Sequence, residues 1–266
     1  MIAFMHPVPI FLAKQTIKML GRLHPSVPQL FINEMYSLQG RGMVQKSIVF
    51  EVKVATSFLK KLGIREPILF DVGAHPGEYS IEFLKHFPSS KVMAFEPNTQ
   101  SFKMLEKRMR SVNNVSLQPI GLGRSNKIQN LYFNCDASPL SSLTRRRLDH
   151  FRLYLDKSEE VTIRTLDSFV SEFNIQPDFI KVDVEGHELE VLEGAVKTLE
   201  KSHLVQFEFG GTMIDTRTYF QDFWYLLTNK GFDIFRISKS RPIAIKSYQE
   251  TEEVFLKSEY LAVRRN

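Results

Sequence analysis

Cysteine is almost absent from the 266-residue sequence, in which Cys135 is the single one. One cysteine cannot form a disulfide within the chain or build a cysteine-based zinc site, so disulfide-stabilised and zinc-stabilised folds are excluded. The sequence also lacks a run of about 18 apolar residues, which a membrane-spanning helix requires. Hydrophobic residues make up 43% and charged residues 24%. We therefore expect a globular cytoplasmic protein with a sizeable core.

Signals for targeting and for nucleic-acid binding are missing too. The apolar stretch at residues 1–12 is interrupted by His6, Pro7 and Pro9, and no small-residue cleavage site follows it, so it is a poor signal peptide. The net charge is +5 and the pI is about 9.2. The lysines are scattered and no binding motif accompanies them, so nucleic acid is not an expected partner.

The chain divides into an N-terminal helical appendage, residues 1–42, and a main domain, residues 43–266. Apolar patches at 11–23 and 30–38, separated by Pro25 and Pro28, predict short helices in the appendage. The main domain begins with an apolar stripe at helical spacing, which predicts a helix over residues 43–62 that packs on the domain. An amphipathic helix on a membrane surface is the alternative for this stripe, and peripheral membrane contact stays open. The stripe consists of Val44, Ile48, Val52, Ala55, Leu59 and Leu62.

Short apolar runs alternate with helical patterns from residue 68 to residue 120. This β-α-β-α-β order predicts a parallel sheet wound in the right-handed sense. Further helices are predicted over residues 168–173, capped by Asp167, and over residues 188–199 and 219–230. Strands are predicted at 68–72, 91–95, 115–120, 128–133, 161–165, 179–184 and 204–209, and a terminal hairpin at 233–237 and 255–263.

Acidic residues stand at or just beyond the ends of these strands, where an open parallel sheet holds its ligand. They are Asp71, Glu96, Asp183, Glu185 and Glu208. In the first strand-to-helix turn, Gly73 and Gly77 are four residues apart, so the G-x-G-x-x-G pattern of a dinucleotide site is not met. Backbone amides of this turn could hold a small carboxylate and Glu96 could accept hydrogen bonds from ribose hydroxyls, which are features of S-adenosylmethionine. A structural turn that needs positive φ is the alternative for the glycine pair.

Four sequence blocks resemble the FkbM family of S-adenosylmethionine-dependent methyltransferases. The resemblance extends from about residue 50 to the C-terminus, and the last block is the most specific. One departure is His75-Pro76, where the family commonly has Asn and a variable residue. The blocks are FDVGAHPGEYS at 70–80, FEP at 95–97, TLD at 165–167 and IKVDVEGHELEVLEGA at 180–195.

The resemblance implies a class I methyltransferase fold, which is a Rossmann-like α/β fold. We accordingly expect a seven-stranded, mostly parallel sheet with an antiparallel C-terminal strand and helices on both faces. Such families mostly methylate hydroxyl groups of sugars, glycans and related small molecules. The residues expected to bind the cofactor are Asp71, Gly73, Ala74, His75, Gly77, Tyr79, Glu96, Pro97 and Asp183.

Methyl transfer to a hydroxyl requires alignment of the reactants and removal of a proton. Asp183, Glu185 and His187 are the candidate catalytic residues, with Asp183 as a cofactor or acceptor contact and Glu185 or His187 as the general base. Alternatively, Glu185 stabilises the N-terminus of the next helix and His187 is a surface residue. A shared divalent cation is conceivable because oxygen ligands suit magnesium, but two carboxylates do not support one, so no metal site is predicted.

The sequence leaves the methyl acceptor and the oligomeric state open. Residues 138–147 are expected over the acceptor side, and Arg145, Arg146 and Arg147 form either a solvated basic face, which we prefer, or a site for an anionic acceptor. Two other functions remain: a nicotinamide-dependent oxidoreductase or epimerase on a similar sheet, and a non-catalytic S-adenosylmethionine-binding or membrane-associated module. The broken glycine pattern and the absence of a Tyr-x-x-x-Lys pair disfavour the oxidoreductase.

Overall fold

A computed structural model describes residues 26–42 and 48–265, together with positions 12, 14–16, 18, 19 and 21. The expected helix at 43–62 is α3, Ile48–Lys61, and the part of its apolar stripe at Val44 lies outside the described residues. The apolar stretch at 1–11 lies outside them as well, and the patch at 11–23 is described only in part. The division of the chain at residues 42 and 43 stays a prediction.

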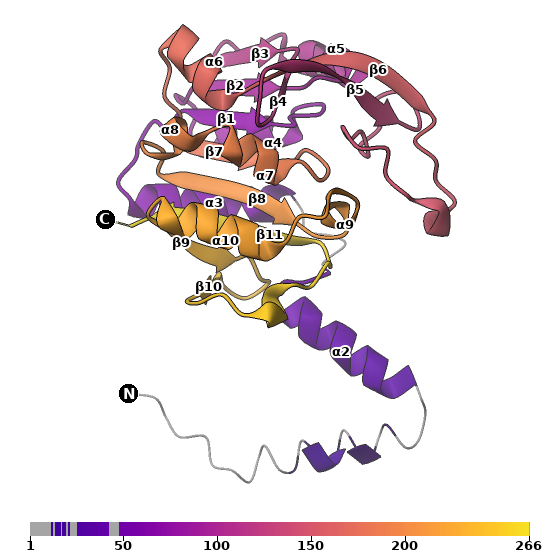
Figure 1. The fold of residues 1–266 in the computed structure, drawn as a ribbon. Helices are drawn as coiled ribbons and strands as arrows, with labels where there is room; N and C mark the ends of the chain where they lie inside the picture. The colour runs from indigo at the N-terminus through magenta and orange to yellow at the C-terminus, as the bar shows by residue number, and fades with distance from the viewer. Residues whose placement is uncertain are drawn as a thin grey trace.

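An eight-stranded sheet forms the middle layer of the molecule (Figure 1). Its order is β10-β9-β11-β8-β7-β1-β2-β3, in which β10 and β11 run antiparallel to the other six strands. The mostly parallel sheet and its antiparallel C-terminal strand are confirmed. The strands are β1 Leu69–Val72, β2 Val92–Phe95, β3 Val115–Gln118, β7 Phe179–Val182, β8 Leu204–Phe209, β9 Phe232–Arg236, β10 Ile243–Ile245 and β11 Ser258–Arg264.

The eighth strand was not predicted. β10 is three residues long and pairs with β9 at the edge of the sheet, between the two strands of the expected terminal hairpin. A run this short carries no readable alternation between polar and apolar residues, so the sequence pattern could not distinguish it from loop.

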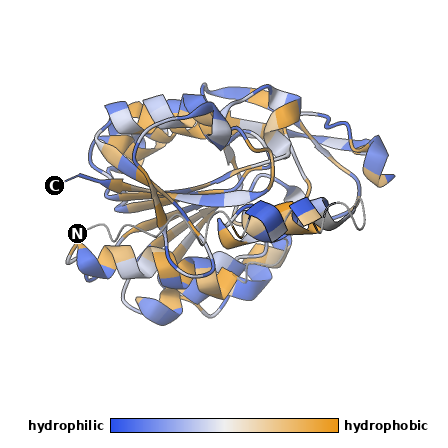
Figure 2. Ribbon diagram, turned by 90° about the horizontal axis from the view of Figure 1, so that it is seen from below, coloured by the Kyte–Doolittle hydropathy of each residue, from blue (hydrophilic) through white to orange (hydrophobic). Residues whose placement is uncertain are grey.

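Helices cover both faces of the sheet because successive strand residues point to opposite sides. In β1, Leu69 packs with one buried cluster and Phe70 and Val72 with the other. The strands in the middle of Figure 2 are accordingly coloured mostly as hydrophobic. The first face carries α3, α4 Glu78–His86 and α5 Thr99–Met109, and the second carries α6 Leu166–Phe173, α7 Glu188–Glu193, α8 Val196–Leu199 and α10 Phe220–Asn229.

A small second sheet lies beside the β3 end of the main sheet in Figure 1. It consists of β4 Gly121–Leu122, β5 Lys127–Phe133 and β6 Lys157–Arg164, in the order β4-β6-β5. Between β5 and β6, residues 134–156 form a long connection that includes the short helix η1, Asp149–Phe151. This connection contains residues 138–147, which were expected over the acceptor side.

Two local predictions were wrong. Asp167 does not cap the helix in which it stands: Thr165 caps α6 by accepting from the Ser168 amide, while Asp167 accepts hydrogen bonds from the amides of Lys197 and Thr198 at the start of α8. The helix expected over 188–199 is broken into α7 and α8 at Gly194. A Cβ on Gly194 would lie 2.1 Å from the carbonyl oxygen of Gly123, so the close approach to the second sheet explains the glycine.

The patch at 30–38 lies within α2, Ser26–Leu38, which projects from the main body (Figure 1). Pro28 does not end this helix, because it stands in the first turn, where a missing backbone donor removes no helical hydrogen bond. Within the part of the chain that the structure describes, no helix has the length and apolar content needed to cross a membrane.

Candidate active site

A cavity of about 280 Å³ opens at the carboxyl ends of β1, β2 and β7. Residues 72–76 and 95–97 line it on the side of the first two strands, and residues 183–185 line it after β7. The second sheet contributes apolar side chains, Leu131 and Ile163 among them. Three of the four strand ends that the sequence singled out, those of β1, β2 and β7, therefore meet at one cavity, and Glu208 at the end of β8 does not line it.

The turn after β1 brings backbone close to the cavity. The amides of Gly73 and Ala74 donate to the Phe95 carbonyl at 3.0 and 2.9 Å. Gly73 has φ +76°, and a Cβ on it would lie 1.9 Å from the carbonyl oxygen of Asp183. No other residue fits this position, because a side chain would collide with backbone that cannot move aside.

Glu96 is buried at the end of β2 and lines the cavity. Its carboxylate accepts hydrogen bonds from the amides of His75 at 2.9 Å and Asn98 at 2.8 Å. Burial raises the pKa of Glu96 to about 7, although these two hydrogen bonds favour the charged form. The carboxylate is thus fixed in place and titrates near neutral pH.

Two of the expected cofactor residues, Asp71 and Tyr79, differ in their position relative to the cavity. Asp71 does not line it: this carboxylate is fully buried, accepts from Ser80 Oγ at 2.6 Å and lies 3.3 Å from Lys181 Nζ. Tyr79 lines the cavity, and its hydroxyl donates to Gln206 Oε1 at 2.6 Å. Any effect of Asp71 on a ligand must therefore pass through its neighbours, Lys181 first.

Lys181 is a functional candidate that the sequence analysis missed. Its Nζ lies 3.3 Å from Asp71 Oδ1 and 3.7 Å from Asp183 Oδ2, and 5.5 Å from the centre of the Tyr79 ring. Burial disfavours the ammonium, but Asp71 and Asp183 raise the pKa of Lys181 above its ordinary value. The available signal was a lysine inside a four-residue strand that is buried along its whole length.

Asp183 follows β7 and faces the cavity. Its side chain is 38% exposed, in contrast to the fully buried Asp71. Burial would raise the pKa of Asp183, but Lys181 and Lys257 lower it below the ordinary value. Asp183 therefore presents a permanent negative charge to the cavity.

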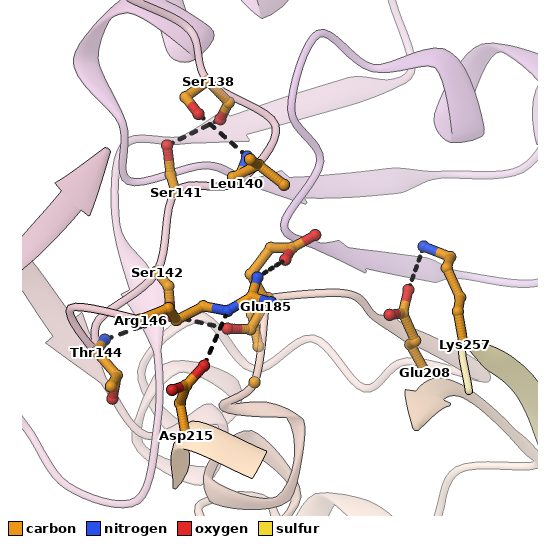
Figure 3. A network of polar contacts seen from close by, with 12 residues as sticks. Ser138, Leu140, Ser141, Ser142, Thr144, Arg146, Glu185, Glu208, Asp215 and Lys257 are labelled. Atoms are coloured by element: carbon orange, nitrogen blue, oxygen red, sulfur yellow. Dashed lines mark hydrogen bonds and ion pairs between the residues drawn. The ribbon is translucent and has the colours of Figure 1, made fainter. Parts of the chain in front are cut away.

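Glu185 lies in the same loop and is held by two residues of the connection 134–156 (Figure 3). Its carboxylate pairs with Arg146 Nη1 at 2.7 Å, and its carbonyl accepts from Ser142 Oγ at 2.7 Å. Arg146 also lies 3.5 Å from Asp215. Burial, Asp183 and Glu208 raise the pKa of Glu185 to about 8, although Arg146 favours the charged form.

Glu208, at the end of β8, forms an ion pair with Lys257 (Figure 3). Glu208 was expected near the site from the sequence, but Lys257 was not. Lys257 lines the cavity and its side chain is about half exposed, whereas Glu208 is buried. Burial and Asp183 raise the pKa of Glu208 to about 7. Glu208 and Lys257, which immediately precedes β11, are 49 positions apart, so no local motif indicates the pair.

His187 and Glu188 turn away from the cavity. His187 is buried, with Nε2 3.0 Å from Thr144 Oγ1 and Nδ1 3.3 Å from Glu190 Oε1. Glu188 accepts from the amides of Val184 at 2.8 Å and Gly186 at 3.0 Å. These contacts hold the loop that presents Asp183 and Glu185, which favours a structural role for both residues.

The connection 134–156 contacts the cavity through His75. This residue has φ +48°, and its Nε2 lies 3.1 Å from the Ala137 carbonyl oxygen. Ser138, Pro139, Ser141 and Leu143 line the cavity from the same connection. His75, which replaces the Asn common in the family, thus links the turn after β1 to this connection through its side chain.

The three consecutive arginines have different surroundings. Arg146 is largely buried in its ion pairs with Glu185 and Asp215, while Arg145 and Arg147 are exposed and Arg145 donates to the Leu155 carbonyl at 3.1 Å. A basic face made of Arg145 and Arg147 agrees with the preferred interpretation of this stretch. Among the described residues, no group of three His, Cys, Asp or Glu side chains is arranged to hold a metal ion.

A family model described as "Methyltransferase FkbM domain" matches residues 71–234, more than half of the chain. The chain is similar to the 2-O-methyltransferase NoeI of Sinorhizobium fredii, at 26% identity over 168 residues that cover 59% of this chain and 69% of NoeI. It is also similar to the hexuronic acid methyltransferase AglP of Haloferax volcanii, at 29% identity over 147 residues that cover 54% of this chain and 56% of AglP.

Among solved structures, the methyltransferase FkbM of Methylobacillus flagellatus KT matches with a TM-score of 0.47 and 17% identity. The match covers 74% of this chain and 44% of that protein. Each of these three relatives therefore extends beyond the part that it shares with this chain.

Proposed function

The chain belongs to the FkbM methyltransferase family, and from this membership we propose that it is an S-adenosylmethionine-dependent O-methyltransferase whose acceptor is a hydroxyl group of a sugar, glycan or related small molecule. The names of NoeI, a 2-O-methyltransferase, and AglP, a hexuronic acid methyltransferase, support this acceptor class. The matched segment covers 56% of AglP, so the acceptor is part of the proposal and not a transferred fact.

The cavity fits the cofactor that this activity requires. The turn at Gly73 presents backbone to the cavity, Glu96 offers a carboxylate to ribose hydroxyls, and Ile120, Leu122 and Ile163 provide apolar surface for a base. We propose that His75, Ala74, Tyr79 and Pro97, which line the cavity, complete this side. Gly77 does not line the cavity; it precedes α4 with φ +86°, packed against Leu105 and Met109, which supports an indirect role in shaping the turn. When bound, S-adenosylmethionine supplies an activated methyl group on a cationic sulfur.

Asp183 suits a contact to a cation or to an acceptor hydroxyl. Its pKa is held low by Lys181 and Lys257, so it stays charged across the physiological range. A fixed carboxylate facing the cavity attracts a sulfonium and orients a hydroxyl donor. The charge is already present before a ligand arrives, so no ionisation is needed at the moment of reaction.

Glu185 is the proposed general base. It lines the cavity next to Asp183, and a pKa of about 8 makes it a stronger base than an ordinary carboxylate. Arg146, 2.7 Å away, holds the carboxylate in place and favours its charged form. The contacts of His187 with Thr144 and Glu190, outside the cavity, support a structural role for that residue.

A nicotinamide-dependent oxidoreductase or epimerase is not favoured. The turn after β1 lacks the middle glycine of the dinucleotide pattern, and the family match supports methyl transfer.

The observation that carries the proposal is that Glu96, the Gly73 turn, Asp183 and Glu185 line one cavity. Transfer of a labelled methyl group to a panel of free and acidic sugars tests it. Glu185→Gln should lower the rate by about 10²–10⁴-fold, which is the usual contribution of a general base. The control is Glu172→Gln, an exposed carboxylate outside the cavity, which should retain most activity.

A measurement of cofactor affinity distinguishes a wrong acceptor class from a wrong general base. Glu185→Gln should bind S-adenosylmethionine as the unchanged protein does. If the protein binds the cofactor but no hydroxyl acceptor takes up label, the proposed acceptor class is wrong. If the Glu185→Gln variant is fully active on an acceptor that the protein does methylate, the proposed base is wrong.

A further inference from the structure

Helix α2 exposes large apolar side chains away from the main body. Leu30 is 65% exposed, Met35 55% and Leu38 54%, and Phe31 and Ile32 are exposed as well. The helix is 13 residues long and contains one charged residue, Glu34. An apolar surface of this kind on a projecting helix marks a site of contact with another body or with a membrane.

A buried joint fixes the base of α2 to the catalytic domain. Arg41 donates to the Thr251 carbonyl at 2.9 Å and to Glu252 at 2.7 Å, and Arg236 donates to the same Glu252 carboxylate at 2.5 Å and to the Gln39 carbonyl at 2.7 Å. Arg41 and Arg236 are both buried. These buried contacts fix the direction in which α2 leaves the domain, so α2 is not a freely moving tail.

The backbone of the joint is equally specific. Gly40 has φ +77°, and a Cβ on it would lie 2.1 Å from the Ile237 carbonyl oxygen. The Gly42 amide donates to the carbonyl of Lys257, whose side chain lines the cavity. The chain that carries α2 therefore enters the domain at the edge of the candidate active site.

The charge of the preceding segment is strongly one-sided. Residues 1–42 contain a single acidic residue, Glu34, against Lys14, Lys18, Arg22 and Arg41. The described positions between Leu12 and Gly21 are helical, and both Lys14 and Lys18 are exposed. Because they are four residues apart, they lie on one side of the helix, whereas Leu12 and Met19, seven apart and also exposed, lie on another.

We propose that α2 and the described helical positions from Leu12 to Gly21, with their exposed Lys14 and Lys18, dock on an anionic lipid surface. Apolar side chains that enter the boundary of the bilayer, combined with lysines attracted to acidic headgroups, supply the two signals that stable peripheral binding requires. The joint at Arg41 then holds the cavity beside that surface. A second copy of the chain fits less well, because the basic residues of this segment would face their own like charges.

Sedimentation of the full chain with lipid vesicles tests the proposal without reference to catalysis. The protein should bind vesicles of phosphatidylcholine with phosphatidylglycerol and bind phosphatidylcholine vesicles less. Leu30→Asp combined with Phe31→Asp should lower binding by at least about tenfold, since each apolar group withdrawn from the bilayer weakens binding. Lys14→Glu combined with Lys18→Glu should lower binding to the anionic vesicles by about tenfold or more.

Ile128→Asp is the matched control, because Ile128 is 70% exposed on β5 of the second sheet, away from α2. This variant should bind vesicles as the unchanged protein does. The proposal is overturned if the unchanged protein does not bind anionic vesicles, or if Ile128→Asp loses as much binding as the Leu30 and Phe31 variant. It is also overturned if light scattering without lipid shows a dimer that the Leu30 and Phe31 changes dissociate, since a second copy would then cover α2.

Discussion

The two sides of the cavity are built in different ways. On the cofactor side, residues 71–79 and 95–98, contacts form between neighbouring parallel strands, as where the Gly73 and Ala74 amides meet the Phe95 carbonyl. On the acceptor side, residues 134–147 and 183–188 with Glu208, Asp215 and Lys257, side chains pair over long sequence separations. We infer that backbone geometry shapes the cofactor side and ion pairs shape the acceptor side.

This difference implies that the two sides can be damaged separately. A change to the cofactor side should impair ligand binding through sterics, while a change to the acceptor side should alter ionisation and leave cofactor affinity intact. Lys181 is the exception, because it contacts Asp71 on one side and Asp183 on the other.

The largest effect is therefore expected at Lys181. Lys181→Met preserves the volume but leaves Asp71 buried without its cation, and removal of one partner of a buried pair costs about 3–5 kcal/mol. Chemical denaturation should show that loss of unfolding free energy. Lys230→Met is the control: its partner Glu200 is 60% exposed, so the loss should stay below about 1 kcal/mol. Equal losses would contradict the role given to Lys181.

Gly73→Ala tests the cofactor side. Positive φ costs about 1–2 kcal/mol for a residue with a Cβ, and the collision with the Asp183 carbonyl adds about 1–3 kcal/mol. Gly63→Ala is a close control, since Gly63 has φ +77° but has nothing within 4 Å of an added Cβ. Gly63→Ala should lose only the first amount and bind the cofactor normally. Normal cofactor binding by Gly73→Ala would contradict the inference that the backbone of this turn shapes the cofactor side.

Arg146→Gln tests the acceptor side. Without its guanidinium, Glu185 loses the contact that holds it and favours its charged form, so the methyl-transfer rate should fall by about 10–100-fold. Cofactor affinity by calorimetry should change less than about twofold, because Arg146 does not line the cavity. Arg145→Gln, at an exposed neighbour, serves as the control. A parallel loss of cofactor affinity would show that the two sides are not separable.

The smallest effect is expected in the pH dependence of cofactor affinity. In the proposed complex, ribose hydroxyls donate to the charged form of Glu96, whose pKa is about 7, so affinity should fall by up to about tenfold per pH unit below that value. The stability of the protein without cofactor has the opposite sign: a pKa raised by folding stabilises the protein below pH 4.5, and this contribution is lost as pH rises through 7. Glu96→Gln should flatten both curves, which titration calorimetry and thermal unfolding across pH can check.

The same contrast explains what the sequence could predict. The Gly73 turn and Glu96 were found because strand ends, glycines and acidic residues occur in local order, and parallel strands bring their carboxyl ends together. Lys181 was missed because a single charged residue within a short apolar run looks like a break in the hydrophobic pattern and gives no sign of a functional role. The pairs Arg146 with Asp215 and Glu208 with Lys257 could not be foreseen, since partner choice depends on tertiary packing.

The distinction extends to the fold. The parallel strands and helices α3, α4, α5 and α10 follow from periodicity over many residues, and they were predicted. Strand β10 and the break at Gly194 depend on contacts with distant segments, so local pattern could not reveal them. Asp167 is a residue type that often caps helices, but its carboxylate accepts hydrogen bonds from α8 and not from α6. This choice of partner depends on the packing of α6 against α8, which local sequence does not reveal.

Calorimetric titration with S-adenosylmethionine, its demethylated product and NAD tests the central claim most directly. The account predicts that the chain binds the first two and not NAD, and that Glu96→Ala weakens S-adenosylmethionine binding by about 1.5–3 kcal/mol, the scale of hydrogen bonds to a charged group. Tight binding of NAD without a response to S-adenosylmethionine would contradict it.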